Sequence, residues 1–403
     1  MLGYEEALQR VLAHAAPLPP RVLPLAEALG LAAAEDIHAL EPVPPFRNAA
    51  MDGFAVRVED AARGRLPVGG TLAAGMAHVP PLAPGTAVRI MTGAPVPPEA
   101  DAVVPLEEAV AEGGEVTFLR PPRPGAHIRL PGEDIPEGGR VVPAGAVIRP
   151  AEAGVLAAIG RPTIPVRPRP RVAVLTTGNE LVDAGTRPGP GQIRDANIHS
   201  LCAQVQAAGG VPLPFPRVED TREAVAAALA AALEAADVVL TNGGISVGDF
   251  DYIKAVLEAE GAEQVFWRVA QKPGAPLGLW VLRGRPVFGI PGNPVAAMLM
   301  FEAYVRPALR SLMGYPHLHR PERTGTMAAL WKRSGDPRRT EFLRVIAERS
   351  PEGLRVRLAG PQGSGILSSL VRANAIALVP EGLTSLTPGD PVRLQMLDEP
   401  EDH

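Results

Sequence analysis

The sequence predicts an α/β multidomain protein. A doubly wound, mainly parallel sheet domain is flanked by β-rich domains and joined to a helical linking domain. Three observations predict this class. The chain has 403 residues, enough for roughly two to four domains. Strand-like and helix-like segments alternate between residues 171 and 314, as in parallel sheets. Short apolar runs broken by glycine and proline lie on both sides of that region.

The composition restricts the class of function. Hydrophobic residues make up 46% of the chain, which supports a sizeable core. The net charge of −5 argues against broad binding to nucleic acid or anionic membranes. Cys202 is the only cysteine, so an intrachain disulfide and a cysteine-built zinc site are excluded. The acidic start and the absence of an apolar run of about 20 residues predict a cytoplasmic protein.

The first 165 residues predict two domains. Residues 4–16 place Leu8, Val11, Leu12 and Ala15 on one helical face. A second helix is expected within residues 17–39 and a third at 146–160, which gives a helical linking domain of residues 1–41 plus 140–165. Residues 42–139 form a β-rich domain, with short apolar runs at 54–58, 87–91, 102–106 and 116–120. The proline-rich residues 161–170 are expected to form a stiff linker.

The rest of the chain predicts an α/β domain of residues 166–318 and a C-terminal β domain of residues 319–403. Strands of the α/β domain are expected at 171–178, 211–215, 237–241 and 286–290, with helices at 198–210, 221–236, 252–261 and 293–314. Strands of the last domain are expected at 324–330, 340–348, 354–360, 375–380 and 392–397.

Ligands of open α/β sheets bind beyond the carboxyl ends of the strands, so the loops there supply the candidate site. After residue 175 come Thr176, Thr177, Gly178 and Glu180, which offer hydroxyl and backbone donors and one carboxylate. A simple turn at a helix start explains the same residues. In the next loop Asp220 either faces the site or forms a capping box with Glu223.

The loop at 243–251 carries the strongest local signal. Gly243 and Gly244 lack Cβ atoms and let backbone amides approach an anion, and Ser246 adds a hydroxyl. Asp249 and Asp251 precede a helix. One acid can cap that helix while the other binds Mg²⁺, which bridges to phosphate through water. We therefore predict a magnesium site at Asp249 and Asp251.

Two further segments add candidates for the same site. Pro291 and Pro294 fix the backbone around Asn293 and would form a rigid pocket wall. Lys272, one of three lysines, lies between a glutamine and a proline. It is either a solvated surface group or a partner for an oxyanion.

Seven motifs occur in a specific order: AMDGFAV (50–56), IMTGAPVP (90–97), GEDI (132–135), TTGNEL (176–181), GGISVGDFDY (243–252), QKPGAP (271–276) and IPGNPV (290–295). Together they cover essentially the whole chain. The series resembles the molybdopterin molybdenumtransferase family of the MoeA type, which is related to the C-terminal part of gephyrin.

The resemblance implies the final step of molybdenum cofactor biosynthesis: molybdenum from molybdate enters adenylylated molybdopterin, and AMP is released. It implies a Mg²⁺-dependent homodimer and possible transient contact with the adenylyltransferase that supplies the nucleotide. The implied catalytic residues are Asp52, Glu180, Asp220 and Asp251. The candidate substrate-binding residues are Thr92, Asp134, Thr177, Gly178, Gly243, Gly244, Ser246, Lys272, Pro291 and Pro294.

The sequence departs from the family pattern at two positions. Asn242 stands where relatives often have serine, and Ala275 stands where a second lysine is common. The second change removes a positive charge near the oxyanions. From the residues alone, Asp52 and Thr92, each followed by glycine, also fit simple tight turns.

Two alternative functions remain open from the sequence: a nucleotide pyrophosphatase on a shared α/β module and a non-catalytic molybdopterin-binding scaffold.

Overall fold

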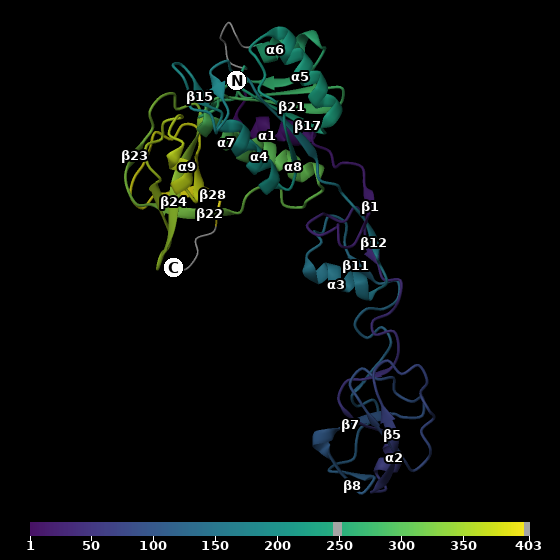
Figure 1. The fold of residues 1–403 in the computed structure, drawn as a ribbon. Helices are drawn as coiled ribbons and strands as arrows, with labels where there is room; N and C mark the ends of the chain where they lie inside the picture. Colours follow the sequence, from purple (N-terminus) through teal and green to yellow (C-terminus); the bar gives the residue numbers. More distant parts are fainter. Residues whose placement is uncertain (245–251, 399–403) are drawn as a thin grey trace. The chain divides into compact units, whose positions relative to one another are not determined.

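A computed structural model describes residues 1–244 and 252–398, which form two units (Figure 1). One unit comprises Met1–Arg21 with Arg167–His403, and the other comprises Val22–Val166. The predicted α/β multidomain class is confirmed. The domain boundaries given above remain predictions.

The first unit contains a six-stranded, mainly parallel sheet. Its order is β16 (Val211–Pro214), β13 (Arg171–Thr176), β17 (Val238–Asn242), β21 (Arg285–Ile290), β20 (Gly278–Leu282) and β18 (Glu263–Trp267). The first four strands are parallel. β20 runs antiparallel to β21, and β18 runs antiparallel to β20, so that only β20 is reversed in this sheet. The four expected strands are present; β18 and β20 were not predicted.

Helices cover both faces of this sheet, because the side chains of a strand alternate between faces. Val172 and Val174 of β13 pack with α4 (Asn197–Ala208) and with the helical segment of α7 (Pro294–Met300), a π turn (Phe301–Val305) and α8 (Arg306–Leu312). The N-terminal helix α1 (Tyr4–Ala13) packs in the same cluster. Ala173 and Leu175 face α5 (Arg222–Ala235) and α6 (Tyr252–Ala259). This layering makes the sheet doubly wound.

The C-terminal strands of the first unit close into a ring. β24 (Thr340–Ser350), β25 (Gly353–Leu358), β22 (Glu322–Met327), β28 (Pro391–Met396) and β26 (Ala375–Val379) pair in that order, and β26 pairs back with β24. The short β19 (Gln271–Lys272) adds to β24. Smaller elements are β23 (Trp331–Lys332), β27 (Ser385–Leu386) and α9 (Ser368–Arg372).

The second unit contains another six-stranded sheet. Its order is β7 (Ala102–Pro105), β4 (Gly53–Val56), β6 (Ala87–Ile90), β5 (Leu66–Leu72), β9 (Glu115–Phe118) and β8 (Ala109–Glu112). Short elements accompany it: α2 (Val58–Ala61), a 3₁₀ turn (Leu106–Glu108), and β3 (Asn48–Ala49) paired with β10 (Ile128–Arg129). This sheet agrees with the predicted β-rich region.

Two predictions for the linking region were wrong. Residues 17–39 form β1 (Arg21–Pro24), β2 (Ile37–His38) and turns instead of a helix. The prolines within this stretch remove backbone donors and fix φ, which disfavours a helix interior. Residues 161–170 are not only a linker, because β12 (Thr163–Val166) pairs with β1. With β11 (Arg140–Val142) and α3 (Pro150–Ala158), these strands surround a small separate core.

Candidate active site at the carboxyl ends of the parallel strands

The strand order reverses at β13. The chain passes from β13 through α4 to β16 on one side and then through α5 to β17 on the other. Such a switch point opens a crevice beyond the carboxyl ends of the strands. A cavity of about 280 Å³ lies there. Seven predicted site residues line it: Thr177, Gly178, Glu180, Asp220, Gly243, Gly244 and Pro294.

Glycines bring the backbone close to this cavity. Gly243 has φ 93°, in the left-handed region that other residues avoid. A Cβ atom there would lie 2.9 Å from both the carbonyl oxygen and Oγ1 of Thr177. A side chain at this position would therefore disturb the cavity wall that is formed by the loop after β13 and the loop after β17.

Two of the carboxylates in the cavity wall belong to predicted residues, Glu180 and Asp220. The Glu180 carboxylate folds over Gly178, where a Cβ atom would lie 2.7 Å from its Oε2. Oδ2 of Asp220 accepts a hydrogen bond from the Asn179 amide at 3.1 Å. The capping alternative for Asp220 was wrong, because Thr221 is the N-cap of α5 and its Oγ1 accepts from the Ala224 amide at 3.2 Å. Asp220 is therefore not engaged as the cap of that helix.

Sequence reasoning missed a polar pair at the start of α4. The Asp195 carboxylate accepts from Thr176 Oγ1 at 2.6 Å and from the Ile198 amide at 3.0 Å. Asn197 donates to Oδ1 of Asn242. Both residues are buried and line the cavity. An aspartate and an asparagine just before an apolar helical stretch were the available signal.

Other predicted residues lie elsewhere in this unit. The Pro291 carbonyl accepts from Nδ2 of Asn242 at 2.7 Å, which fixes the loop after β21. Nζ of Lys272 contacts Glu341 at 3.0 Å and Ser334 at 2.8 Å, because β19 pairs with β24. Lys272 is not among the residues that line the cavity. Its role toward an oxyanion remains a prediction.

Three predicted residues, Ser246, Asp249 and Asp251, lie outside the described residues. Within residues 1–244 and 252–398, no group of three or more histidine, cysteine or acidic side chains is placed to hold a metal ion. Mg²⁺ is usually bound through one or two carboxylates together with substrate phosphates and water. The oxygen donors Glu180 and Asp220 are compatible with that mode of binding.

The remaining predicted residues belong to the second unit. Oδ1 of Asp52 accepts from the Thr92 amide at 2.7 Å and from Thr92 Oγ1 at 2.6 Å. The hydrogen bond from the Thr92 hydroxyl, followed by that from the amide, lowers the pKa of Asp52. Asp134 is exposed, and its amide donates to the Val43 carbonyl at 3.0 Å. Asp52 and Thr92 thus join two loops of this unit, one before β4 and one after β6.

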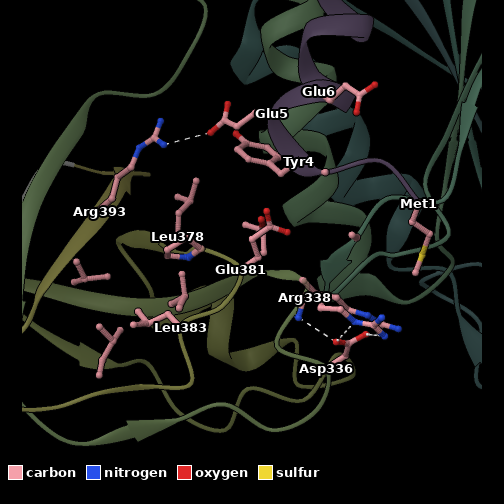
Figure 2. Close-up of a pocket in the computed structure, with 18 of the residues that line it drawn as sticks. Met1, Tyr4, Glu5, Glu6, Asp336, Arg338, Leu378, Glu381, Leu383 and Arg393 are labelled. Atoms are coloured by element: carbon pink, nitrogen blue, oxygen red, sulfur yellow. Dashed lines mark hydrogen bonds and ion pairs between the residues drawn. The ribbon is translucent and has the colours of Figure 1, made fainter.

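A larger cavity of about 940 Å³ separates the first residues of the chain from the C-terminal ring (Figure 2). Its walls carry the ion pairs Arg393–Glu5, at 3.4 Å, and Arg338–Asp336, at 3.0 Å. None of the predicted site residues lines it. The volume of a cavity alone therefore does not identify the active site. The smaller cavity at the strand ends, which the predicted residues line, remains the candidate active site.

Comparisons with known proteins agree with this layout. Residues 2–160 match the model of the MoeA N-terminal region (domains I and II), 173–311 match a probable molybdopterin binding domain, and 328–397 match the MoeA C-terminal region (domain IV). Molybdopterin molybdenumtransferase 2 of Mycobacterium tuberculosis is 37% identical over 94% of this chain and 95% of the relative. The chain belongs to the molybdopterin molybdenumtransferase family.

Further members of the molybdopterin molybdenumtransferase family show the same full-length match. The Haemophilus influenzae molybdopterin molybdenumtransferase is 34% identical over 98% of each chain. The crystal structure of a molybdopterin biosynthesis MoeA protein from Pyrococcus horikoshii matches with a TM-score of 0.85 and 31% identity, over 99% of this chain and 100% of that one. The family is one of molybdenum cofactor biosynthesis, as the sequence motifs indicated.

In the described part of the chain, no helix has both the length and the apolar character needed to cross a membrane.

Proposed function

We propose that this protein inserts molybdenum from molybdate into adenylylated molybdopterin and releases AMP. The observation that supports this most directly is the 280 Å³ cavity, where Glu180, Asp220 and the Gly243 backbone meet beyond the strand ends. Carboxylates beside exposed glycine backbone suit a phosphorylated ligand when a cation lies between the carboxylates and the phosphate.

The residues of the cavity would have separate roles. The backbone amide of Gly244 would stabilise negative charge as the bond to phosphorus breaks, whereas the amide of Gly243 donates to the Ile290 carbonyl at 3.1 Å. Glu180 and Asp220 would hold Mg²⁺ together with the substrate phosphates, and Asp251 is proposed as a further ligand. When bound, Mg²⁺ neutralises phosphate charge. The network of Asp195 and Asn197 would keep the loop ends fixed around the substrate.

We further propose that the enzyme acts in the cytoplasm as a homodimer. Family resemblance supports a partner subunit that brings Asp52, Thr92 and Asp134 to the site. It also supports transient contact with an adenylyltransferase that hands over the nucleotide. The single cysteine in the chain is consistent with a protein that does not depend on disulfides.

The test is an AMP-release assay with purified protein, adenylylated molybdopterin, Mg²⁺ and molybdate. We expect AMP and active cofactor from the wild type, and strongly reduced AMP release from Glu180→Gln and Asp220→Asn. AMP release no faster than in a protein-free control would refute the proposal. Hydrolysis of free dinucleotides lacking a pterin would instead favour a pyrophosphatase. Cofactor formation by Asp251→Ala at the wild-type rate would favour a scaffold.

A further inference from the structure

The C-terminal ring contains a buried arginine that has no carboxylate partner among the described residues. Arg344 of β24 is 1% exposed. The Glu341 carboxylate on the same strand is engaged by other cations, because it contacts Lys272 at 3.0 Å and Arg333 at 3.3 Å. Burying a charge without a counter-ion is costly unless hydrogen bonds replace the lost hydration. The groups that bind this guanidinium therefore indicate its role.

Arg344 binds one loop of the ring through both its side chain and its backbone. Nη2 donates to the carbonyls of Pro361 and Gly363, at 3.0 Å each. Nε donates to Oγ of Ser369 at 2.9 Å. The Gln362 side chain accepts from the amide of Arg344 at 2.9 Å and donates to its carbonyl at 3.1 Å. These contacts fix the loop between β25 and α9, here called the β25–α9 loop, against β24.

The β25–α9 loop also contacts the wall of the candidate active site. Oγ of Ser364 accepts a hydrogen bond of 3.1 Å from Nδ2 of Asn293. Asn293 is the N-cap of α7, and its neighbours Gly292 and Pro294 line the 280 Å³ cavity. The loop therefore connects the C-terminal ring to the segment that follows β21.

The side chain of Asn293 binds the ring instead of its own helix. An asparagine at the N-cap usually accepts a hydrogen bond from an amide in the first turn of the helix. Asn293 makes no such bond, and its Oδ1 is buried without a hydrogen-bond partner in the described part of the chain. The contact with Ser364 thus replaces the usual cap, which indicates that the ring helps to fix the segment after β21.

We propose that Arg344 is a positioning residue of the active site. It holds the β25–α9 loop in place, so that Ser364 fixes Asn293 and, with it, the adjoining wall of the cavity. Arg344 is not among the described residues that line this cavity, so it acts through the loop and not on the substrate. The inference rests on the proposed function, because it concerns the same cavity.

The direct test is hydrogen–deuterium exchange of the full-length protein, measured by mass spectrometry. Arg344→Met removes the donors but keeps a long side chain. Amides of residues 360–367 should exchange faster. Amides of residues 292–297, which follow β21, should also exchange roughly three- to tenfold faster, since a hydrogen bond contributes about that factor. Arg344→Lys cannot donate to both carbonyls and Ser369 from one planar group, and serves if the methionine variant does not fold.

Two variants at Ser364 test the contact itself, and one at Arg355 is the control. Ser364→Ala should speed the exchange of residues 292–297 and leave β24 unchanged, whereas Ser364→Thr keeps the hydroxyl and should behave as the wild type. Arg355→Met is matched to Arg344→Met, since Arg355 is an exposed arginine of β25 in the same ring. It should leave the exchange of residues 292–297 unchanged.

The kinetics of AMP release provide a second readout. Arg344→Met should lower kcat/KM per folded molecule by roughly three- to tenfold, through the loss of the contact with Asn293. A merely structural role would lower the amount of folded protein and leave kcat/KM per folded molecule unchanged. The double variant of Arg344→Met and Ser364→Ala should be no worse than Arg344→Met alone, because both changes act through the same contact.

Two results would overturn the positioning role. One is faster exchange in Arg344→Met that is confined to residues 360–367 and leaves residues 292–297 as in the wild type. The other is a double variant whose losses in kcat/KM simply add, which would mean that Arg344 and Ser364 act independently. A wild type that releases no AMP would refute the proposed function, but the exchange measurement would still decide whether Arg344 positions Asn293.

Discussion

Nδ2 of Asn197 donates a hydrogen bond of 2.7 Å to Oδ1 of Asn242. The same nitrogen donates to the Gly292 carbonyl at 2.7 Å. Asn242 in turn donates to the Pro291 carbonyl. One side chain at the start of α4 therefore joins the ends of β17 and β21. Asn242 is therefore part of the framework of the site.

We predict that Asn197→Ala lowers the free energy of unfolding by about 1–3 kcal/mol, because it leaves buried acceptors without donors. Urea denaturation monitored by circular dichroism measures this change. Gln206→Ala on the exposed face of the same helix is the control and should have little effect. Equal losses in the two variants would mean that the Asn197 hydrogen bonds contribute nothing specific.

Gly243→Ala should destabilise the site more than the backbone conformation alone explains. A left-handed non-glycine residue costs about 1–2 kcal/mol, and the new Cβ also meets Thr177 at 2.9 Å. Gly261→Ala separates the two causes, since Gly261 has φ 77° with open space around it. We expect a larger drop in melting temperature for Gly243→Ala than for Gly261→Ala. Similar drops would show that the loop shifts to accommodate the methyl group.

The sequence predicted the four parallel strands of the sheet and the loops that follow them, because both depend on local patterns. Apolar runs followed by glycine located the ends of β13 and β17, and parallel strands bring such ends together. The false helix at 17–39 had apolar residues but also prolines, whose effect on the backbone prevailed. The contact of Lys272 with Glu341 depends on the pairing of β19 with β24. Those strands are far apart in sequence, so no local pattern could indicate it.

Thr221 and Asp220 should separate stability from activity. Thr221→Ala removes the cap of α5 and should lower the free energy of unfolding by about 0.5–2 kcal/mol, while AMP release per folded molecule stays unchanged. Asp220→Asn keeps an oxygen for the Asn179 amide and should cost little stability, yet AMP release should fall strongly. Unfolding curves and the AMP assay on both variants provide the check. Full activity in Asp220→Asn would remove Asp220 from the catalytic residues.

The hydrogen-bonded pair of Asp52 and Thr92 predicts a measurable titration. The Thr92 hydroxyl, and then its amide, stabilise the carboxylate of Asp52 and lower its pKa. A carboxyl group whose pKa is lower in the folded state contributes stability above its unfolded-state pKa, and that contribution is lost as the pH falls through the folded-state pKa. Asp52 should therefore stay ionised at neutral pH and titrate below the ordinary aspartate range. Carbon-detected NMR of the side-chain carboxyl group measures this titration.

Thr92→Val tests the cause of that shift, because valine keeps the shape and the backbone amide but removes the hydroxyl. The pKa of Asp52 should move back toward its ordinary value without reaching it, since the amide hydrogen bond of 2.7 Å remains. Asp36, whose pKa is lowered by the Ala144 amide and then by Arg140, is the internal control in the same spectra and should not move. An Asp52 titration that is identical in the wild type and in Thr92→Val would show that the hydroxyl does not hold the carboxylate in solution.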